Sequence, residues 1–433
     1  MLKRSLGLVH ATALVVGIIV GASIFVQPSA IAASVPDIGA VSLVWIAAGI
    51  LTLFGALIAA ELSTAFPKAG GVYVFLSEAF SPGVAYLWGW AMFWTMHTGI
   101  IAAIATVFAR YVGFFVDVGD TGLRLIAIAA VFTLSAINYL GVKQGSIVQT
   151  TLTIVKIVAV IGITALAFLL GPDQPIQPTN PLTHQPTNTH AFVAAIVAGL
   201  FAFGGWHMVT YAAEETVDPE RTLPKALIIG VCIVTACYLA LNAAYFHVLP
   251  HDVVGKSTRV AADAAAAVVG SGGAAVVSLV VALSALGALN GVILAGPRVY
   301  LAMARDRVAP SWVGGIHETY RTPHRAIVIQ AAWAAVLLST GTYRALFTRV
   351  VYTEWIFFAL MAAGLIALRR RPEYVPRFRV PLHPVIPVLF ILASLYIVLD
   401  QMIATPKESI VGLLLVLVGW PVYLLTLRKS RTQ

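Results

Sequence analysis

The sequence predicts an all-α polytopic membrane protein with twelve transmembrane helices. Only 10% of its 433 residues are charged and 60% are hydrophobic, whereas a soluble globular protein carries about 25% charged residues. The mean hydropathy is +0.92. Apolar segments long enough to cross a bilayer recur along the whole chain. We place these spans at roughly residues 8–35, 40–64, 82–115, 122–140, 147–170, 190–214, 224–248, 273–303, 325–340, 351–368, 384–404 and 409–427.

The basic residues predict the orientation of these spans. The net charge of +9 could suggest a nucleic-acid partner, but its distribution favours a membrane protein. If the N-terminus is cytoplasmic, nineteen of the 27 lysines and arginines fall on that side and seven on the other. The positive-inside rule therefore predicts a multi-pass protein of the cell membrane with both termini in the cytoplasm, and no nucleic-acid partner.

The connecting segments predict a single transmembrane domain over residues 1–433. The loops are short, and the longest irregular stretch, residues 171–189, holds prolines and no basic residue, which is typical of an external loop. Cys232 and Cys237 both lie in one apolar span, so we expect no structural disulfide. Neither cysteine has the spacing of a metal site, and the sequence indicates no metal and no cofactor.

Two spans are interrupted by small residues near their middle. Span 1 contains residues 17–25 (GIIVGASIF), and span 6 contains residues 198–207 (AGLFAFGGWH). Close helix packing through small residues is one explanation. Glycine-interrupted spans at matching positions of two halves also indicate a midplane site between inverted repeats. We therefore expect a 5+5 arrangement, with repeats at roughly 8–170 and 190–368 and two accessory helices at 384–427.

Broken helices offer backbone groups to a ligand. The N–H groups that begin the second half of span 1 carry partial positive charge and suit a carboxylate. Carbonyl groups that end the first halves of both spans suit an ammonium group. Together they describe the head group of an α-amino acid. The predicted substrate-binding residues are Ile18, Ile19, Gly21, Ala22, Ser23, Ile24, Phe201, Ala202, Phe203 and Gly204, with Asn290 of span 8 as a further polar candidate that could instead bond between helices.

Several motifs resemble the amino acid–polyamine–organocation superfamily. Residues 21–28 (GASIFVQP) are similar to its G-S-G-I-F-V-x-P signature. Residues 201–206 (FAFGGW), followed by Glu214-Glu215 and residues 221–226 (RTLPKA), resemble the L-type amino acid transporter branch, and the similarity continues through spans 8 to 11. Three positions depart from the pattern: Ala22 replaces a serine, Ser23 a glycine and Phe203 a tyrosine.

The resemblance implies a LeuT-like fold, with broken helices 1 and 6 and alternating access, and a secondary amino acid transporter. In sodium-independent members a lysine of span 5 takes the place of a sodium ion, and we carry that role over to Lys156, which is costly to bury in a span unless it is paired. Exchange and proton symport both stay open. The eukaryotic relatives bind a glycoprotein through a loop cysteine. The loop at 116–122 has none, so no disulfide-linked partner is expected.

Two further residues could set specificity or carry a proton. Glu354, near the outer start of span 10, could bind a cationic side chain, carry a proton or lie at the membrane interface. His207, where the L-type branch has an asparagine, could add polarity or pH sensitivity, or could be a packed and hydrogen-bonded histidine. Phe201, Phe203 and the crowding at Ser23 favour neutral L-amino acids, while Glu354 keeps cationic amino acids or polyamines as alternatives.

Other classes of membrane protein fit the sequence less well. A channel would show a filter sequence, and an enzyme or an ATP-driven pump would show a metal-ligand set, a nucleophile with a base, or a phosphate-binding motif. The sequence contains no such pattern, so we expect no enzymatic activity. A receptor that binds an amino acid without transporting it stays open.

Overall fold

The computed structural model describes residues 2–21, 23–171, 189–257, 259–341 and 352–430. These residues form helices joined by short segments, which confirms the predicted all-α membrane architecture. Most of the predicted external loop, residues 172–188, lies outside the described residues, as does Ala22. The elements of the first five spans are α1 (Leu8–Ile19), η1 (Ser23–Phe25), α2 (Gln27–Ser34), α3 (Ile38–Ala65), α4 (Val72–Ala79), α5 (Pro82–Ala91), η2 (Met92–Met96), α6 (His97–Val112), α7 (Gly119–Leu140) and α8 (Val142–Leu170).

The second part of the chain contains the remaining spans. Its elements are α9 (Thr189–Ala202), η3 (Trp206–Glu215), α10 (Pro219–Val248), α11 (His251–Lys256), α12 (Val260–Val269), η4 (Gly270–Gly272), α13 (Gly273–Ala295), α14 (Pro297–Arg305), η5 (Ser311–Gly314), α15 (His324–Thr340), α17 (Thr353–Leu368), α18 (Val385–Ala404), α19 (Pro406–Leu417) and α20 (Gly419–Ser430). Within the described ranges, nine helical segments are long and apolar enough to cross a membrane, and α1, α15 and α17 are shorter apolar helices of the remaining spans.

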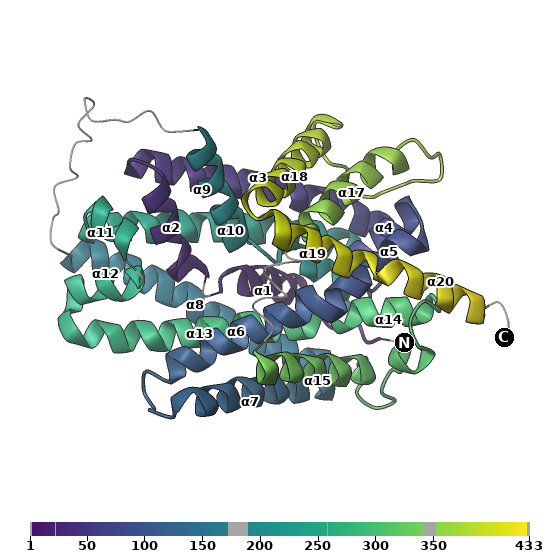
Figure 1. Cartoon of the computed structure of the whole chain (residues 1–433), viewed down its shortest axis with the longest axis horizontal. Coiled ribbons are helices and arrows are strands. Elements are labelled where there is room, and N and C mark those ends of the chain that lie inside the picture. Colours follow the sequence, from purple (N-terminus) through teal and green to yellow (C-terminus); the bar gives the residue numbers. More distant parts are fainter. Residues whose placement is uncertain (1, 22, 172–188, 258, 342–351, 431–433) are drawn as a thin grey trace.

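Helices from the two halves of the chain pack in matching pairs. The second span, α3, packs along the seventh, α10; the third, α6, packs along the eighth, α13; and the fourth, α7, packs along the ninth, α15. Helix α1 lies near the centre of the bundle and contacts α8, α10, α13 and η3 (Figure 1). The last helices, α18 to α20, cover α3 and α5 from outside. The central position of α1 places its interruption in the interior.

Both predicted interruptions are breaks in the helices. Helix α1 ends at Ile19, and a short 3-10 turn resumes at Ser23. Helix α9 ends at Ala202, and η3 begins at Trp206. Gly205 between them has φ +92°, a left-handed conformation that glycine adopts without a steric penalty. The second glycine of the span 6 motif is therefore required by the backbone geometry.

Candidate functional site

A cavity of about 260 Å³ lies where the two breaks meet. This volume is close to the lower end of the roughly 300–1,000 Å³ of typical ligand pockets. Its walls come from both breaks and from α6, α13 and α17. The lining residues are Ile18, Ile19, Gly21, Ser23, Ile100, Ala103, Ile104, Val107, Leu200, Phe201, Ala202, Gly204, Gly205, Trp206, Met208, Ala288, Val292, Glu354, Trp355 and Phe358. The side chains that line the cavity are thus mostly apolar.

Many of the predicted substrate-binding residues line this cavity. Those of the α1 break are Ile18, Ile19, Gly21 and Ser23, and those of the α9–η3 break are Phe201, Ala202 and Gly204. Glu354 lines it as well. The predicted position Ala22 lies outside the described residues. The structure therefore brings the two breaks to one cavity, as their spacing in the sequence suggests.

Phe203 and Ile24 lie away from the cavity, unlike the predicted arrangement. Both side chains are buried. The Phe203 ring has its centroid 5.0 Å from that of Tyr238 and 6.4 Å from that of Trp45, so it packs between α3 and α10 behind the break. In a span that is apolar on every face, the sequence does not show which aromatic side chain faces the ligand and which faces a neighbouring helix.

Asn290 also lies outside the cavity lining, in a polar network between helices. Its Nδ2 group donates to the Gly145 carbonyl at 3.1 Å and to Gln149 Oε1 at 3.0 Å. Its Oδ1 atom accepts from Asn138 Nδ2 at 2.9 Å. Asn290 is fully buried, so these bonds satisfy an amide that would otherwise be costly in the bilayer. It joins α13 to α7 and α8, which is the alternative that the sequence left open.

Lys156 of α8 reaches the end of α1. Its Nζ atom donates to the carbonyls of Gly17 at 2.6 Å and Val20 at 2.7 Å, and the residue is 2% exposed. Carbonyls at a helix C-terminus lack partners within the helix and carry partial negative charge. From α13, Ser284 Oγ contacts the carbonyls of Val20 at 3.1 Å and Gly21 at 3.3 Å. A cation and a hydroxyl therefore hold the broken end of α1 from two sides.

Tyr238 of α10 links the two breaks, a role that sequence reasoning did not assign to it. Its hydroxyl lies 3.0 Å from the Ile19 carbonyl and 2.9 Å from the Ala202 carbonyl. A hydroxyl has one proton to donate, so it can bond only one of these carbonyls at a time. The signal in the sequence was a tyrosine inside an apolar span, which by itself indicates only a hydrogen bond to another helix.

Glu354 and His207 approach each other at the cavity. Glu354 Oε1 lies 3.6 Å from His207 Nε2, longer than a hydrogen bond. His207 lies behind the wall, fully buried, with its ring against those of Trp88, Tyr211 and Phe358. The structure thus places Glu354 in the wall of the cavity.

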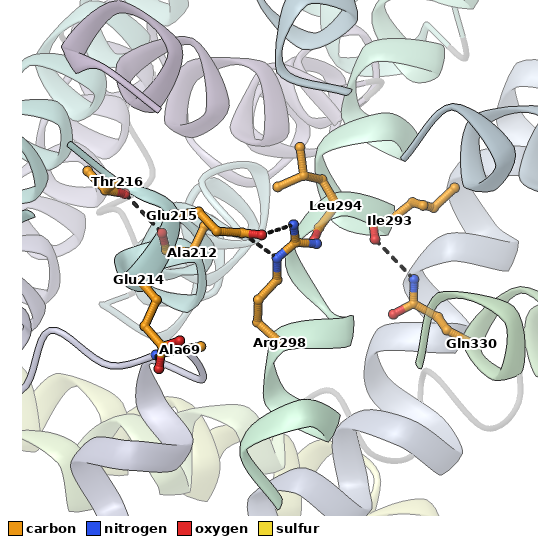
Figure 2. Close-up of polar contacts among 9 residues, drawn as sticks. All are labelled: Ala69, Ala212, Glu214, Glu215, Thr216, Ile293, Leu294, Arg298 and Gln330. Carbon is orange, nitrogen blue, oxygen red and sulfur yellow. Dashed lines mark hydrogen bonds and ion pairs between the residues drawn. The ribbon is translucent and has the colours of Figure 1, made fainter. Parts of the chain in front are cut away.

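A buried ion pair closes the bundle toward the end where α14 and α20 lie (Figure 1). Arg298 of α14 donates to Glu215 at the end of η3 through Nε at 2.8 Å and Nη2 at 3.0 Å, and also bonds the Leu294 carbonyl. Figure 2 shows the two side chains pointing toward each other, while the neighbouring Glu214 points toward Ala69. Ser5 and Leu6 donate their backbone N–H groups to the Glu215 carbonyl. These contacts join η3, α14 and the N-terminal segment at that end of the molecule.

The chain was compared with known proteins. Residues 6–422 match the sequence model of a family described as amino acid permease. The chain is 32% identical to the serine/threonine exchanger SteT of Bacillus subtilis over 98% of this chain and 96% of that protein. It is 33% identical to the b(0,+)-type amino acid transporter 1 of Mus musculus, over 98% of this chain and 88% of that protein. The large neutral amino acids transporter small subunit 2 of Oryctolagus cuniculus is 30% identical, over 98% and 80%.

Proposed function

Because this chain belongs to the amino acid permease family, we propose that it is a secondary transporter that exchanges neutral L-amino acids across the cell membrane. The family assignment rests on the match over residues 6–422 and on relatives at 32% and 33% identity over nearly the whole chain. One of these relatives is named a serine/threonine exchanger, and a third relative is named for large neutral amino acids. The proposed activity is transport rather than catalysis.

The observation that carries this proposal is the cavity between two broken helices. Gly21 and Ser23 line it, and Ser23 begins a helical segment, where the partial positive charge of the N–H groups favours a carboxylate. The Gly21 N–H group itself donates to the Ile19 carbonyl at 2.7 Å. Ile18, Ile19 and Ala202 face it from helix ends, where carbonyl groups accept from an ammonium group. The two ends of one amino acid head group would thus meet opposite backbone charges.

Tyr238 supports the ammonium position. Its one proton cannot satisfy both the Ile19 and the Ala202 carbonyl. The Ile19 carbonyl also accepts from the Gly21 N–H group at 2.7 Å. A substrate ammonium has three donors and could bond the carbonyl that does not receive the hydroxyl proton. We therefore place the substrate nitrogen beside Ile19 and Ala202, with the carboxylate beside Gly21 and Ser23. The predicted contact of Ala22 stays a prediction.

We propose that transport does not require sodium, because Lys156 already supplies a cation to the end of α1. Its two bonds to Gly17 and Val20 join α8 to α1. A fixed ammonium at this position would take the structural place of a metal ion. Proton symport is the second coupling mode that we carry forward, because Glu354 supplies an ionisable group in the cavity wall.

The repeat organisation and the orientation are part of the same proposal. The pairwise packing of α3 with α10, α6 with α13 and α7 with α15 supports repeats at roughly 8–170 and 190–368 related by an axis through the bundle centre. The distribution of basic residues favours cytoplasmic termini. With that orientation, the layer of Glu215 and Arg298 closes the cytoplasmic side of the cavity. No disulfide-linked partner is part of this proposal.

Counterflow in proteoliposomes tests the proposed function. Purified protein is reconstituted with unlabelled leucine, alanine or serine inside, and uptake of the same radiolabelled amino acid is followed with and without sodium at two pH values. We expect internal amino acid to accelerate uptake equally with and without sodium. Absence of acceleration with every amino acid would leave a binding protein without transport activity and overturn the proposal.

A further inference from the structure

Glu354 places a carboxylate in the wall of an otherwise apolar cavity. It lies in the first turn of α17, next to Trp355 and one turn before Phe358, and all three residues line the cavity. Its side chain is only 12% exposed. A carboxylate with so little access to water is costly to keep charged unless a proton or a cation neutralises it.

The fold provides an arginine to each of two other buried carboxylates. Glu61 of α3 accepts from Arg369 Nε at 2.8 Å and from the Val380 N–H group at 2.6 Å. Glu215 accepts from Arg298 through two nitrogen atoms. Both glutamates are fully buried. These two pairs show how this protein neutralises a buried carboxylate with an arginine of its own.

Glu354 has no such arrangement in the described part of the chain. Within that part, His207 is the only basic side chain within 4.0 Å of its carboxylate, and its Nε2 atom lies at 3.6 Å. The imidazole is enclosed by Trp88, Tyr211 and Phe358, an environment that disfavours a second charge. The side of Glu354 that faces the cavity is where a further cation can approach.

We propose that Glu354 binds the cationic side chain of a substrate, so that the cavity accepts amino acids with a side-chain ammonium or guanidinium group as well as neutral ones. This inference rests on the proposed function and extends its substrate class. The α-ammonium has its own acceptors in the carbonyls of Ile19 and Ala202. The carboxylate of Glu354 is therefore available to the side chain, and the apolar wall of Trp355 and Phe358 can pack against the methylene groups that precede the charge.

Competition between two amino acids of similar shape tests this inference. Lysine and norleucine differ chiefly in the charged end of the side chain, and each is titrated against labelled leucine exchange. The variants are Glu354→Gln, which removes the charge but keeps the shape, and Glu354→Asp, which keeps the charge. Glu373→Gln removes an exposed carboxylate in the loop after α17 and serves as the control.

We expect Glu354→Gln to weaken inhibition by lysine relative to norleucine by roughly tenfold or more, because a desolvated charge pair is lost. Glu354→Asp should keep part of the preference, and Glu373→Gln should match the wild type. If Glu354→Gln no longer exchanges, the affinities for lysine and norleucine are compared in a thermal unfolding assay. Each amino acid is titrated onto the purified variant, and the concentration that stabilises it against heating is measured.

The inference is overturned if the ratio of the inhibitory concentrations of lysine and norleucine is the same in Glu354→Gln as in the wild type. So does a wild-type protein that exchanges leucine but does not respond to lysine. Equal weakening of both ligands, or a change only in the pH dependence of leucine exchange, would make Glu354 a proton carrier or a structural residue instead. Failure of the proposed function is a separate result, because then the wild type shows no counterflow with any amino acid.

Discussion

Replacement of Lys156 by methionine is the most direct test of how the broken end of α1 is held. Methionine is unbranched and apolar and fills much of the same space, but it has no N–H donor. The substitution therefore removes the bonds to the Gly17 and Val20 carbonyls and leaves the surrounding helices in place. Ser284 still contacts the Val20 carbonyl, while the Gly17 carbonyl loses the ammonium.

The size of the effect follows from these two bonds. A hydrogen bond to a charged group contributes about 1.5–3 kcal/mol, and a buried carbonyl left without a partner costs about 1–3 kcal/mol. A net loss of about 3 kcal/mol in the arrangement of α1 against α8 corresponds to roughly a hundredfold change in an equilibrium constant. Conformations that interconvert during transport differ by a few kcal/mol. Exchange in Lys156→Met should therefore fall at least tenfold.

The assay is counterflow of a labelled neutral amino acid in proteoliposomes that contain equal amounts of folded protein. Lys143→Met, which replaces an exposed lysine of the same helix, is the control. Thermal unfolding in detergent checks that the variant folds. Exchange at the wild-type rate in Lys156→Met, with normal protein content, would refute the argument that this cation is needed to hold α1.

Three further substitutions test neighbouring contacts. In Gly287→Ala the added Cβ atom would lie 2.8 Å from Lys156 Cε, so the lysine must move from its carbonyls and exchange should fall without a change in the cavity lining. Tyr238→Phe keeps the packed ring but removes the hydroxyl, and the half-saturating substrate concentration should rise about fivefold, the equivalent of about 1 kcal/mol; an unchanged value would contradict the placement of the ammonium. Arg298→Met should destabilise the protein by about 3–5 kcal/mol because Glu215 stays buried without a partner, and adding Glu215→Gln should recover part of this loss. Strictly additive effects in thermal or denaturant unfolding would show that the two side chains do not interact.

The breaks in the two helices could be predicted because small residues gather near the middle of two spans that take matching positions along the chain. Gly204-Gly205 falls between the end of α9 and the start of η3, and Gly205 requires a positive φ. The span 1 break follows Val20, as residues 17–25 indicate. Backbone geometry of this kind depends on the local sequence, and the hydropathy of the spans likewise depends on local composition.

The partners of polar side chains could not be predicted, because they come from distant parts of the chain. Asn290 bonds to Asn138 and Gln149, and the Tyr238 hydroxyl contacts carbonyls of both breaks. Each contact depends on how the helices are rotated, and helices that are apolar on every face do not reveal their rotation. Phe203 shows the same limit, since its neighbour Phe201 lines the cavity while Phe203 packs against Tyr238.

The arrangement of donors around the breaks gives substrate binding a way to influence the conformation. Tyr238 is the side chain whose hydroxyl contacts carbonyls of both breaks, and it can bond either Ile19 or Ala202 but not both. The Ile19 carbonyl also accepts from the Gly21 N–H group at 2.7 Å. An ammonium that bonds one of the two carbonyls directs the hydroxyl proton to the other, so substrate adds a donor to the pair of helix ends. A ligand shifts a conformational equilibrium by its difference in affinity for the two states. We therefore expect the link between the α1 end and the α9 end to be stronger with substrate bound, which favours movement of the two broken helices together.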